Sequence, residues 1–280
     1  MSAAQESLSR NLYPAFAAGE DVAWTVASGA VDLFLVDRDD EGRPAGPRTH
    51  LGRLEQGMSI LGFGDDSDLR AGVLICPAAG ARVESRNSAL SVEELEAWID
   101  FLALAAAEEL LPRNALSLGA GGEIELPSAG PVHASSRLIW IFGESELQLL
   151  GDAAGAITGP GFFPLTRRCW VVAPAGSRLT AVDTERWRGL DPAAFALRRF
   201  HTGILQTLAA KRARAEQATA ALLRSRAELD SRGLDHVLRK LTRAQTGKAE
   251  EGDDGTTTDA LALACQAVGK SAGIQLKPPP

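Results

Sequence analysis

Cysteine is scarce in this 280-residue chain, and so are aromatic residues. There are three cysteines, and no two of them form a Cys-x-x-Cys pair, which argues against a disulfide scaffold and against a zinc ribbon. Aromatic residues make up 5% of the chain, while hydrophobic residues make up 45%, so a packed core is feasible. No apolar run reaches the roughly 18 residues that a membrane-spanning helix needs, and residues 1–10 lack the features of a secretory signal.

Catalytic motifs are also missing. Gly269-Lys270-Ser271 matches the end of a phosphate loop, but Ala264 stands where the loop needs its first glycine. The metalloprotease motif HExxH and the hydrolase motif GxSxG do not occur. The sequence therefore predicts no enzyme activity in this chain. It names no catalytic, cofactor-binding or metal-binding residue, and it predicts no cofactor for the chain itself.

The histidine and cysteine residues are predicted to have structural roles and not to bind metal or act in catalysis. The four histidines are isolated in the sequence, with no spacing typical of a metal site, so we expect each to lie at the surface or half-buried. Two of the cysteines lie in apolar, strand-like runs and are expected to be buried, inert thiols. The residues concerned are His50, His133, His201 and His236, together with Cys76 and Cys169; Cys265 has no partner motif either.

Charge divides the chain into blocks. Residues 1–110 hold 8 basic and 19 acidic residues, whereas residues 111–190 are balanced. Residues 191–248 hold 12 basic and 5 acidic residues, and the remainder is acidic. Such blocks are typical of separate structural units. The basic block could contact the acidic block, lie on an anionic membrane face or be a solvated helix surface. The net charge of −7 argues against nucleic acid as a partner.

Strand patterns and helix patterns alternate along the chain. Residues 22–36 predict two strands joined by a hairpin at Ser28-Gly29, and Asp37–Pro47 predicts a loop. Ser91 and Glu94 form a capping box that begins a helix ending at Pro112. A second strand-rich stretch follows. Helical spacing then runs for about fifty residues after the cap at Asp191, with an interruption at Gly233.

Two stretches of the sequence resemble each other. Residues 69–83 align with 166–179, which matches Pro77 with Pro174, Gly80 with Gly176 and Arg82 with Arg178. Upstream, residues 57–61 align with 161–165, and Trp98 and Trp187 occupy similar places near the start of a helix. An internal repeat of this kind predicts two tandem small β-rolls, each followed by a helix.

Residues 26–35, with Ser28-Gly29 before a strand, resemble the β-roll of cyclic-nucleotide-binding-like domains. Phe63-Gly64-Asp65 resembles the Phe-Gly-Glu that opens the family's phosphate-binding cassette. Here Asp65, Asp66 and Asp68 crowd the phosphate position, and Arg70 comes too early for the family's arginine. Phe142-Gly143-Glu144 looks like a second cassette start, but the repeat aligns it with the strand at 31–36, so we interpret it as a decoy.

The whole arrangement resembles the N-terminal cytoplasmic region of the permease/ATPase subunits of NHLP-type bacteriocin-export ABC transporters. The resemblance rests on the two rolls, Leu95-Glu96-Ala97-Trp98, Gly161-Phe162-Phe163-Pro164-Leu165, the long Ala/Arg-rich helix and residues 259–269. It implies an α+β chain at the inner face of the bacterial inner membrane. Membrane helices and a nucleotide-binding domain using ATP and Mg²⁺ would follow in the parent polypeptide.

The predicted organisation has five parts. These are a first β-roll plus helix (1–113), a degenerate second β-roll (114–190), long basic amphipathic helices (191–246), a disordered linker (247–258) and the start of a following domain (259–280). The predicted function is a non-catalytic regulatory or docking module of a peptide exporter. Its partners would be the rest of its own polypeptide, a second copy, a peptide cargo or a partner transporter subunit.

Two other functions stay open. The first is a stand-alone, cyclic-nucleotide-like sensor of a small anion, in which Arg70, Arg82 and Arg178 would supply positive charge. The second is an enzyme on a cupin-like barrel, which would need a metal triad that the scattered histidines do not suggest.

Overall fold

The computed structural model describes residues 15–17, 22–63, 70–86, 90–191 and 195–246. Its contacts divide the chain into two units, Met1–Arg214 and Ala215–Pro280. The first unit is a mixed α+β structure with several antiparallel sheets. The predicted linker at 247–258 and the predicted domain start at 259–280 lie outside the described residues.

We use the name first roll for strands β1 to β7. One sheet has the order β1-β6-β3-β4, and the other has the order β5-β2-β7. The strands are β1 (Ala15–Phe16), β2 (Ala23–Ser28), β3 (Ala30–Arg38), β4 (Pro44–Glu55), β5 (Ser59–Leu61), β6 (Ala71–Pro77) and β7 (Arg82–Arg86). Valine, leucine and isoleucine side chains from both sheets fill the space between them.

Two strand predictions need correction here. The two strands predicted within residues 22–36 exist, but β2 and β3 belong to different sheets, so Gly29 links the sheets and does not close a hairpin. A β-carbon on Gly29 would lie 2.8 Å from the Ala81 Cα, and its φ of +73° favours glycine. The loop predicted at Asp37–Pro47 is much shorter, because β4 begins at Pro44. Proline is tolerated there because β4 is an edge strand.

Helix α2 (Val92–Ala106) begins with the predicted capping box. The Ser91 hydroxyl accepts the Glu94 amide proton, and the Glu94 carboxylate accepts from the Ser91 amide. Its buried face carries Trp98 and aliphatic side chains. The helix ends at Ala106 rather than at Pro112, and Leu110 is 92% exposed, so the apolar spacing beyond Ala106 does not mark a buried face.

We use the name second roll for strands β8 to β16. Its sheets have the orders β13-β12-β15-β10-β8 and β14-β11-β16-β9, and every pairing except β8 with β10 is antiparallel. The strands are β8 (Leu116–Leu118), β9 (Glu123–Glu125), β10 (Gly130–Ala134), β11 (Ile139–Gly143), β12 (Leu147–Leu149), β13 (Ala156–Ile157), β14 (Gly161–Leu165), β15 (Val171–Ala173) and β16 (Arg178–Val182). A 3-10 turn, η1 (Ala153–Gly155), precedes β13.

The strand orders of the two rolls correspond. The order β1-β6-β3-β4 matches β10-β15-β12-β13, and β7-β2-β5 matches β16-β11-β14. Register supports this equivalence, because Trp24 of β2 lies opposite Ile60, and Trp140 of β11 lies opposite Pro164. Strand β11 therefore takes the place of β2. This corrects the expected equivalence of Phe142 with the strand at 31–36.

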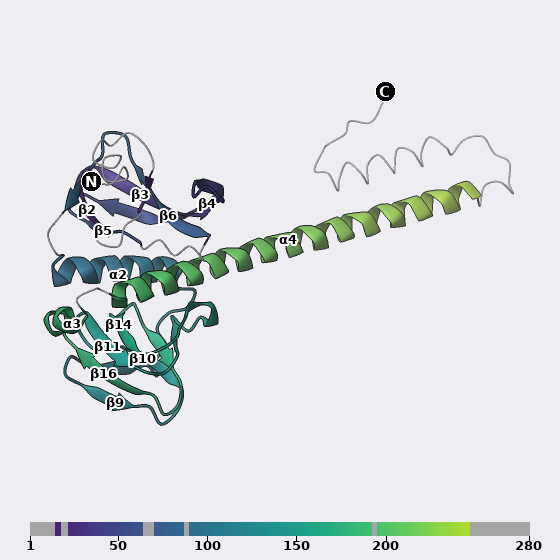
Figure 1. Ribbon diagram of the computed structural model, residues 1–280. Coiled ribbons are helices and arrows are strands. Elements are labelled where there is room, and N and C mark those ends of the chain that lie inside the picture. The colour runs from purple at the N-terminus through teal and green to yellow at the C-terminus, as the bar shows by residue number, and fades with distance from the viewer. Residues whose placement is uncertain (1–14, 18–21, 64–69, 87–89, 192–194, 247–280) are drawn as a thin grey trace. The chain divides into compact units, whose positions relative to one another are not determined.

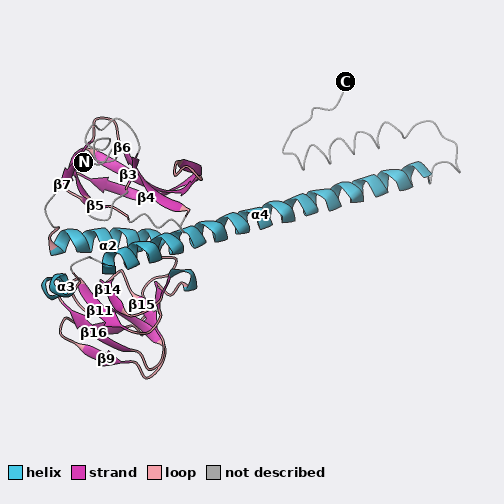
Figure 2. Cartoon of the chain, in the orientation of Figure 1, coloured by secondary structure: helices cyan, strands magenta, loops and turns pink. Residues whose placement is uncertain are grey.

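Two further helices follow the second roll. Helix α3 (Thr184–Leu190) begins at Asp183, whose carboxylate accepts the Arg186 amide proton. Helix α4 (Phe195–Thr246) begins in the first unit and continues in the second. The helix passes through Gly233 without a break, so the predicted interruption is wrong. Figures 1 and 2 show α2 and the first part of α4 between the strands of the two rolls.

Candidate functional site

The arginines of the anion-sensor hypothesis are not brought together. Arg70 pairs with Asp40 at 3.2 Å, Arg82 pairs with Glu84 at 3.1 Å, and Arg178 pairs with a carboxylate of its own roll at 3.3 Å. Their side chains are 80%, 62% and 69% exposed. Exposed pairs of this kind are weakly held and solvated.

The cassette region falls between β5 and β6. Phe63 is buried there, and residues 64–69, with the three crowded aspartates, lie outside the described residues. In the second roll the equivalent connection is the short turn from Thr166 to Trp170, where the Thr166 hydroxyl accepts the Cys169 amide proton at 2.8 Å. The apparent cassette start at Phe142-Gly143 lies in strand β11, as expected of a decoy.

The histidines lie apart from one another. His50 pairs with Asp32 at 3.1 Å, His133 bonds to Ser117 at 2.7 Å, and His236 is exposed. His201 corrects the expectation of an exposed or half-buried ring, because it is 5% exposed. Within the described residues, no three histidine, cysteine, aspartate or glutamate side chains are placed to hold a metal ion.

The cysteines differ in burial. Cys169 is buried, and desolvation holds the pKa of its thiol well above the usual range. Cys76 is half-buried, and burial also raises the pKa of its thiol. Both thiols therefore stay protonated near neutral pH, which makes them poor nucleophiles. Cys265 lies outside the described residues.

His201 occupies the junction between the two rolls. Its Nε2 accepts the indole proton of Trp98 at 3.0 Å, and its ring lies 4.4 Å from that of Phe63. The neighbouring Phe200 contacts Phe163 of the second roll at 5.9 Å between ring centroids. Burial lowers the pKa of His201 to about 3, so the ring is neutral at physiological pH. None of these aromatic residues is close to another in the sequence except His201 and Phe200.

Polar side chains of α4 contact both rolls. The Arg199 guanidinium donates to the Gly159 carbonyl of the second roll at 2.8 Å. Lys211 Nζ donates at 3.0 Å to the carbonyls of Ala105 and Ala107 at the end of α2. Arg212 pairs with Asp37 of the first roll. Part of the basic block therefore does contact the acidic block.

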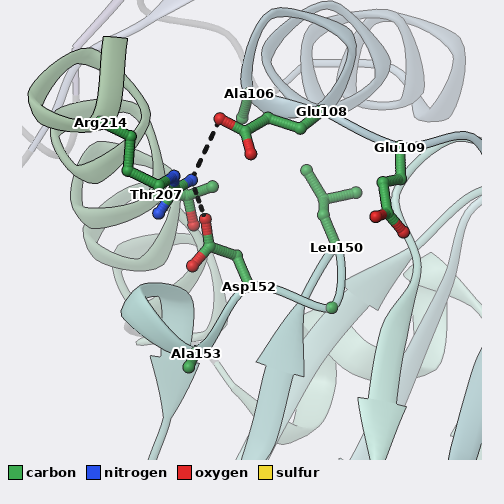
Figure 3. Close-up of a pocket in the computed structure, with 9 residues that line it drawn as sticks. Ala106, Glu108, Glu109, Leu150, Asp152, Ala153, Thr207 and Arg214 are labelled. Atoms are coloured by element: carbon green, nitrogen blue, oxygen red, sulfur yellow. Dashed lines mark hydrogen bonds and ion pairs between the residues drawn. The ribbon is translucent and has the colours of Figure 1, made fainter. Parts of the chain in front are cut away.

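A cavity of about 230 Å³ lies beside α4 (Figure 3). Arg214 Nη2 contacts Asp152 Oδ2 at 2.6 Å and Glu108 Oε1 at 3.2 Å. These hydrogen bonds raise the pKa of Arg214. The remaining lining residues come from the end of α2, from the segment after β12 and from α4: Ala106, Glu109, Leu150, Gly151, Ala153 and Thr207. Sequence reasoning missed this cavity, since its residues come from three separate segments.

A second hollow of about 390 Å³ lies on the second roll, lined by Phe142, Arg178 and neighbouring polar residues. Phe142 is 37% exposed and packs edge-on against Phe162 at 5.3 Å. Arg178 pairs there with Glu123 at 3.7 Å and with Glu125 at 3.3 Å, and Glu144 also lines the hollow, so carboxylates outnumber the guanidinium.

Comparisons with known proteins leave the family open. No family model matches the chain, and no curated protein matches it. Among solved structures, the CO-dependent transcription factor CooA from Carboxydothermus hydrogenoformans is 12% identical, with a TM-score of 0.23 over 56% of this chain and 78% of that chain. The regulatory domain of Toxoplasma gondii PKA with cAMP is also 12% identical, with a TM-score of 0.17 over 71% of this chain and 80% of that chain.

Among the described residues, no helix is long and apolar enough to cross a membrane.

Proposed function

We propose that the chain is a non-catalytic regulatory module made of two tandem β-rolls that together hold the start of helix α4. The equivalent strand orders and the shared tryptophan position support a duplicated roll. A single observation carries the regulatory role, namely that α4 has anchors in both rolls. A change in either roll would therefore change how firmly α4 is held, and α4 continues beyond the rolls.

Amide hydrogen exchange tests this coupling. Asp37→Asn removes the first-roll partner of Arg212, and Asp152→Asn removes the second-roll partner of Arg214. Each substitution should speed exchange at residues 205–216 of α4, because local opening becomes easier when an anchor is lost. Glu84→Gln is the matched control, since Glu84 pairs with an arginine in its own roll. Unchanged exchange in both variants would contradict the coupling.

The finer proposal is that this module regulates or docks a bacterial peptide exporter, as the sequence arrangement suggests. The basic and exposed part of α4 would then face the rest of the transporter at the inner face of the membrane. Determining the reading frame beyond codon 280 tests this proposal. Apolar spans of about twenty residues and a complete phosphate-loop motif would support it. A stop codon directly after codon 280 would exclude the hypothesis that the module is part of the transporter polypeptide.

Self-association through α4 belongs to the same proposal. Leu222, Leu223 and Leu238 are 72%, 63% and 54% exposed along this helix. Helices with exposed leucines can pair in a dimer. Sedimentation at rising concentration should show a dimer, and a protein that stays monomeric throughout would exclude this contact.

The alternative function is a stand-alone sensor of a small anion. It keeps support only from the roll architecture, because the three candidate arginines are separately paired. Thermal denaturation of the full chain with a panel of cyclic nucleotides distinguishes the two functions. A specific ligand must raise the melting temperature in a saturable way. If no cyclic nucleotide changes the melting temperature, the tested nucleotides are excluded as ligands and the docking role is favoured.

A further inference from the structure

Strand β4 has one edge that no strand of the described chain covers. It stands at the end of the sheet order β1-β6-β3-β4, so β3 pairs with one edge, and the other edge is open among the described strands. At 12 residues, β4 is about twice the usual length of a strand. An edge strand presents backbone N–H and C=O groups that a strand of another chain can pair with, and proteins usually keep such edges short. A long open edge is therefore a candidate for pairing with another strand.

Two features limit the part of β4 that can pair. Pro47 has no N–H to donate, so an added strand can pair continuously only from Arg48 onward. At the other end, β4 stops at Glu55, and the chain turns at Gly57, whose φ is +88°. The open segment of β4 is therefore residues 48–55.

A β-bulge lies in the middle of the open segment. The pairing of β4 with β3 shifts between His50 and Gly52, so Leu51 is an extra residue in β4. Residues 48–50 precede the bulge and residues 53–55 follow it. If the bulge is counted as one position, the two halves of the segment are equal in length.

The charged side chains of the open segment lie on the solvent face of the sheet. His50 and Arg53 both contact Asp32 of β3, at 3.1 Å and 2.7 Å. Side chains two positions apart on a strand point to the same face, so Arg48 lies beside His50 and Glu55 beside Arg53. Arg48 and Glu55 are exposed, and neither forms an ion pair within the described residues. Two opposite charges therefore stand unpaired at the two ends of the segment.

This charge pattern makes the segment complementary to itself. In an antiparallel pair of β4 strands from two copies, related by a two-fold axis through the bulge, Arg48 of each copy lies opposite Glu55 of the other. Opposite charges that face each other across an antiparallel pair stabilise it, whereas like charges destabilise it. The same alignment puts Pro47 of each copy opposite Gln56 of the other, where β4 has already ended. The proline therefore interrupts no pairing.

The other charged side chains are compatible with this alignment. His50 of one copy lies opposite Arg53 of the other. Within each copy, the Asp32 carboxylate contacts both of these side chains and so offsets their charge. The only ion pairs that the alignment adds are therefore those of Arg48 with Glu55.

We propose that two copies of this chain associate through the open edges of β4, with residues 48–55 of the two strands antiparallel about the bulge. The pairing joins two four-stranded sheets into one sheet of eight strands across a two-fold axis. This surface is separate from the exposed leucines of α4, so the inference goes beyond the proposed function. Because the contact is small, we expect the dimer to form at high protein concentration.

Sedimentation velocity over a concentration series measures this association in the full chain. Leu222→Ser with Leu223→Ser, at two exposed leucines, removes association through α4 and serves as the background for every comparison. A dimer should persist in this background. If association disappears there, it forms through α4, so the β4 proposal fails while the α4 contact stands. A wild-type chain that stays monomeric at every concentration excludes both contacts.

Charge reversal tests the register of the pairing. Arg48→Glu puts like charges opposite each other at two symmetry-related positions, so it should weaken the dimer about tenfold or more. Arg48→Glu combined with Glu55→Arg restores opposite charges and should return the dissociation constant to within about threefold of the background value. Arg113→Glu, the same reversal at an exposed arginine outside the first roll, is the matched control and should change nothing. A double variant as weak as Arg48→Glu alone would overturn the proposal.

Amide exchange gives a readout that a general effect of surface charge would not change. The outward N–H groups of residues 48–55 become hydrogen-bonded in the dimer, so their exchange should slow as the protein concentration rises. Strand β9, an edge strand of the second roll, is the matched control and should show no such change. Dimerisation without protection at residues 48–55 would put the contact elsewhere and overturn the proposal.

Discussion

Trp24 in the first roll and Trp140 in the second roll occupy the same place in equivalent strands, but their indole groups are held differently. Trp140 stacks on Trp187 of α3 with ring centroids 3.6 Å apart, and its Nε1 donates to the Thr184 hydroxyl at 3.0 Å. Trp24 is fully buried, and its Nε1 has no hydrogen-bond partner among the described residues. The second roll is therefore closed by a helix of its own.

The first roll is closed by a helix that it shares. Two carboxylates of helix α2 accept hydrogen bonds from the two rolls. Glu94 accepts from the Ser59 hydroxyl of the first roll, and Asp100 accepts from the Thr166 hydroxyl of the second roll. Its Trp98 donates to His201 of α4. The comparison shows that the same arrangement of strands can be covered in two ways. The second roll is covered by α3, a helix that belongs to it alone, and the first roll is covered by α2, a helix that also contacts the second roll. In the proposed regulatory role, the junction is the part through which the two rolls would act on α4.

The largest expected effect comes from breaking the junction. Phe200 is fully buried and contacts Phe163, and Phe200→Ala should lower the free energy of unfolding by about 3–5 kcal/mol. Phe195→Ala, at a residue 55% exposed on the same helix, should cost less than about 1 kcal/mol. Urea unfolding followed by circular dichroism measures both. A loss confined to one of two separate transitions would show that the rolls do not unfold together.

The next effect depends on pH. The pKa of His201 is lowered to about 3 in the folded protein, below its unfolded value of 6.5. On acidification the unfolded state therefore binds the proton first, and stability falls between about pH 6.5 and pH 3. At pH 4.5 the loss of unfolding free energy due to His201 amounts to roughly 2–3 kcal/mol. His201→Gln removes the titration and can still offer an acceptor to Trp98. The difference in unfolding free energy between pH 7 and pH 4.5, measured with urea, should be smaller in this variant by that amount. If the variant and the wild-type protein lose the same stability on acidification, His201 is not the group responsible.

Local sequence signals predicted much of the roll architecture. The aligned segments 57–61 and 161–165 end in the equivalent strands β5 and β14, and Gly57 and Gly161 both have positive φ. Gly80 and Gly176 likewise precede equivalent strands with positive φ. These glycine positions could be predicted from the sequence because the geometry of a turn depends on the residue at the turn itself.

Features that depend on distant contacts could not be predicted. The burial of His201 requires Phe63 and Trp98, which come from other elements, and no spacing in the sequence connects them. Strand β4 extends back to Pro44 because its pairing with β3 outweighs the local preference of Gly and Pro for turns. The cavity around Arg214 was missed for the same reason, since its lining comes from segments far apart in the chain.

The smallest expected effect sharpens the comparison of the two tryptophans. Trp24→Phe and Trp140→Phe remove the same volume and the same indole proton from equivalent strands. In the second roll the change leaves the Thr184 hydroxyl, which is 2% exposed, without its donor, whereas in the first roll it removes a donor that had no acceptor. An unsatisfied buried group costs about 1–3 kcal/mol.

Trp140→Phe should therefore be less stable than Trp24→Phe by about 1–2 kcal/mol in urea unfolding at pH 7. The double variant Trp140→Phe with Thr184→Val serves as the control. It should recover part of the loss, because the orphaned hydroxyl is gone and the two residues are in contact. Equal losses in the two single variants would mean that closure by α3 adds nothing to the second roll beyond the burial of an aromatic ring, and the distinction between a private and a shared helix would then lose its energetic basis.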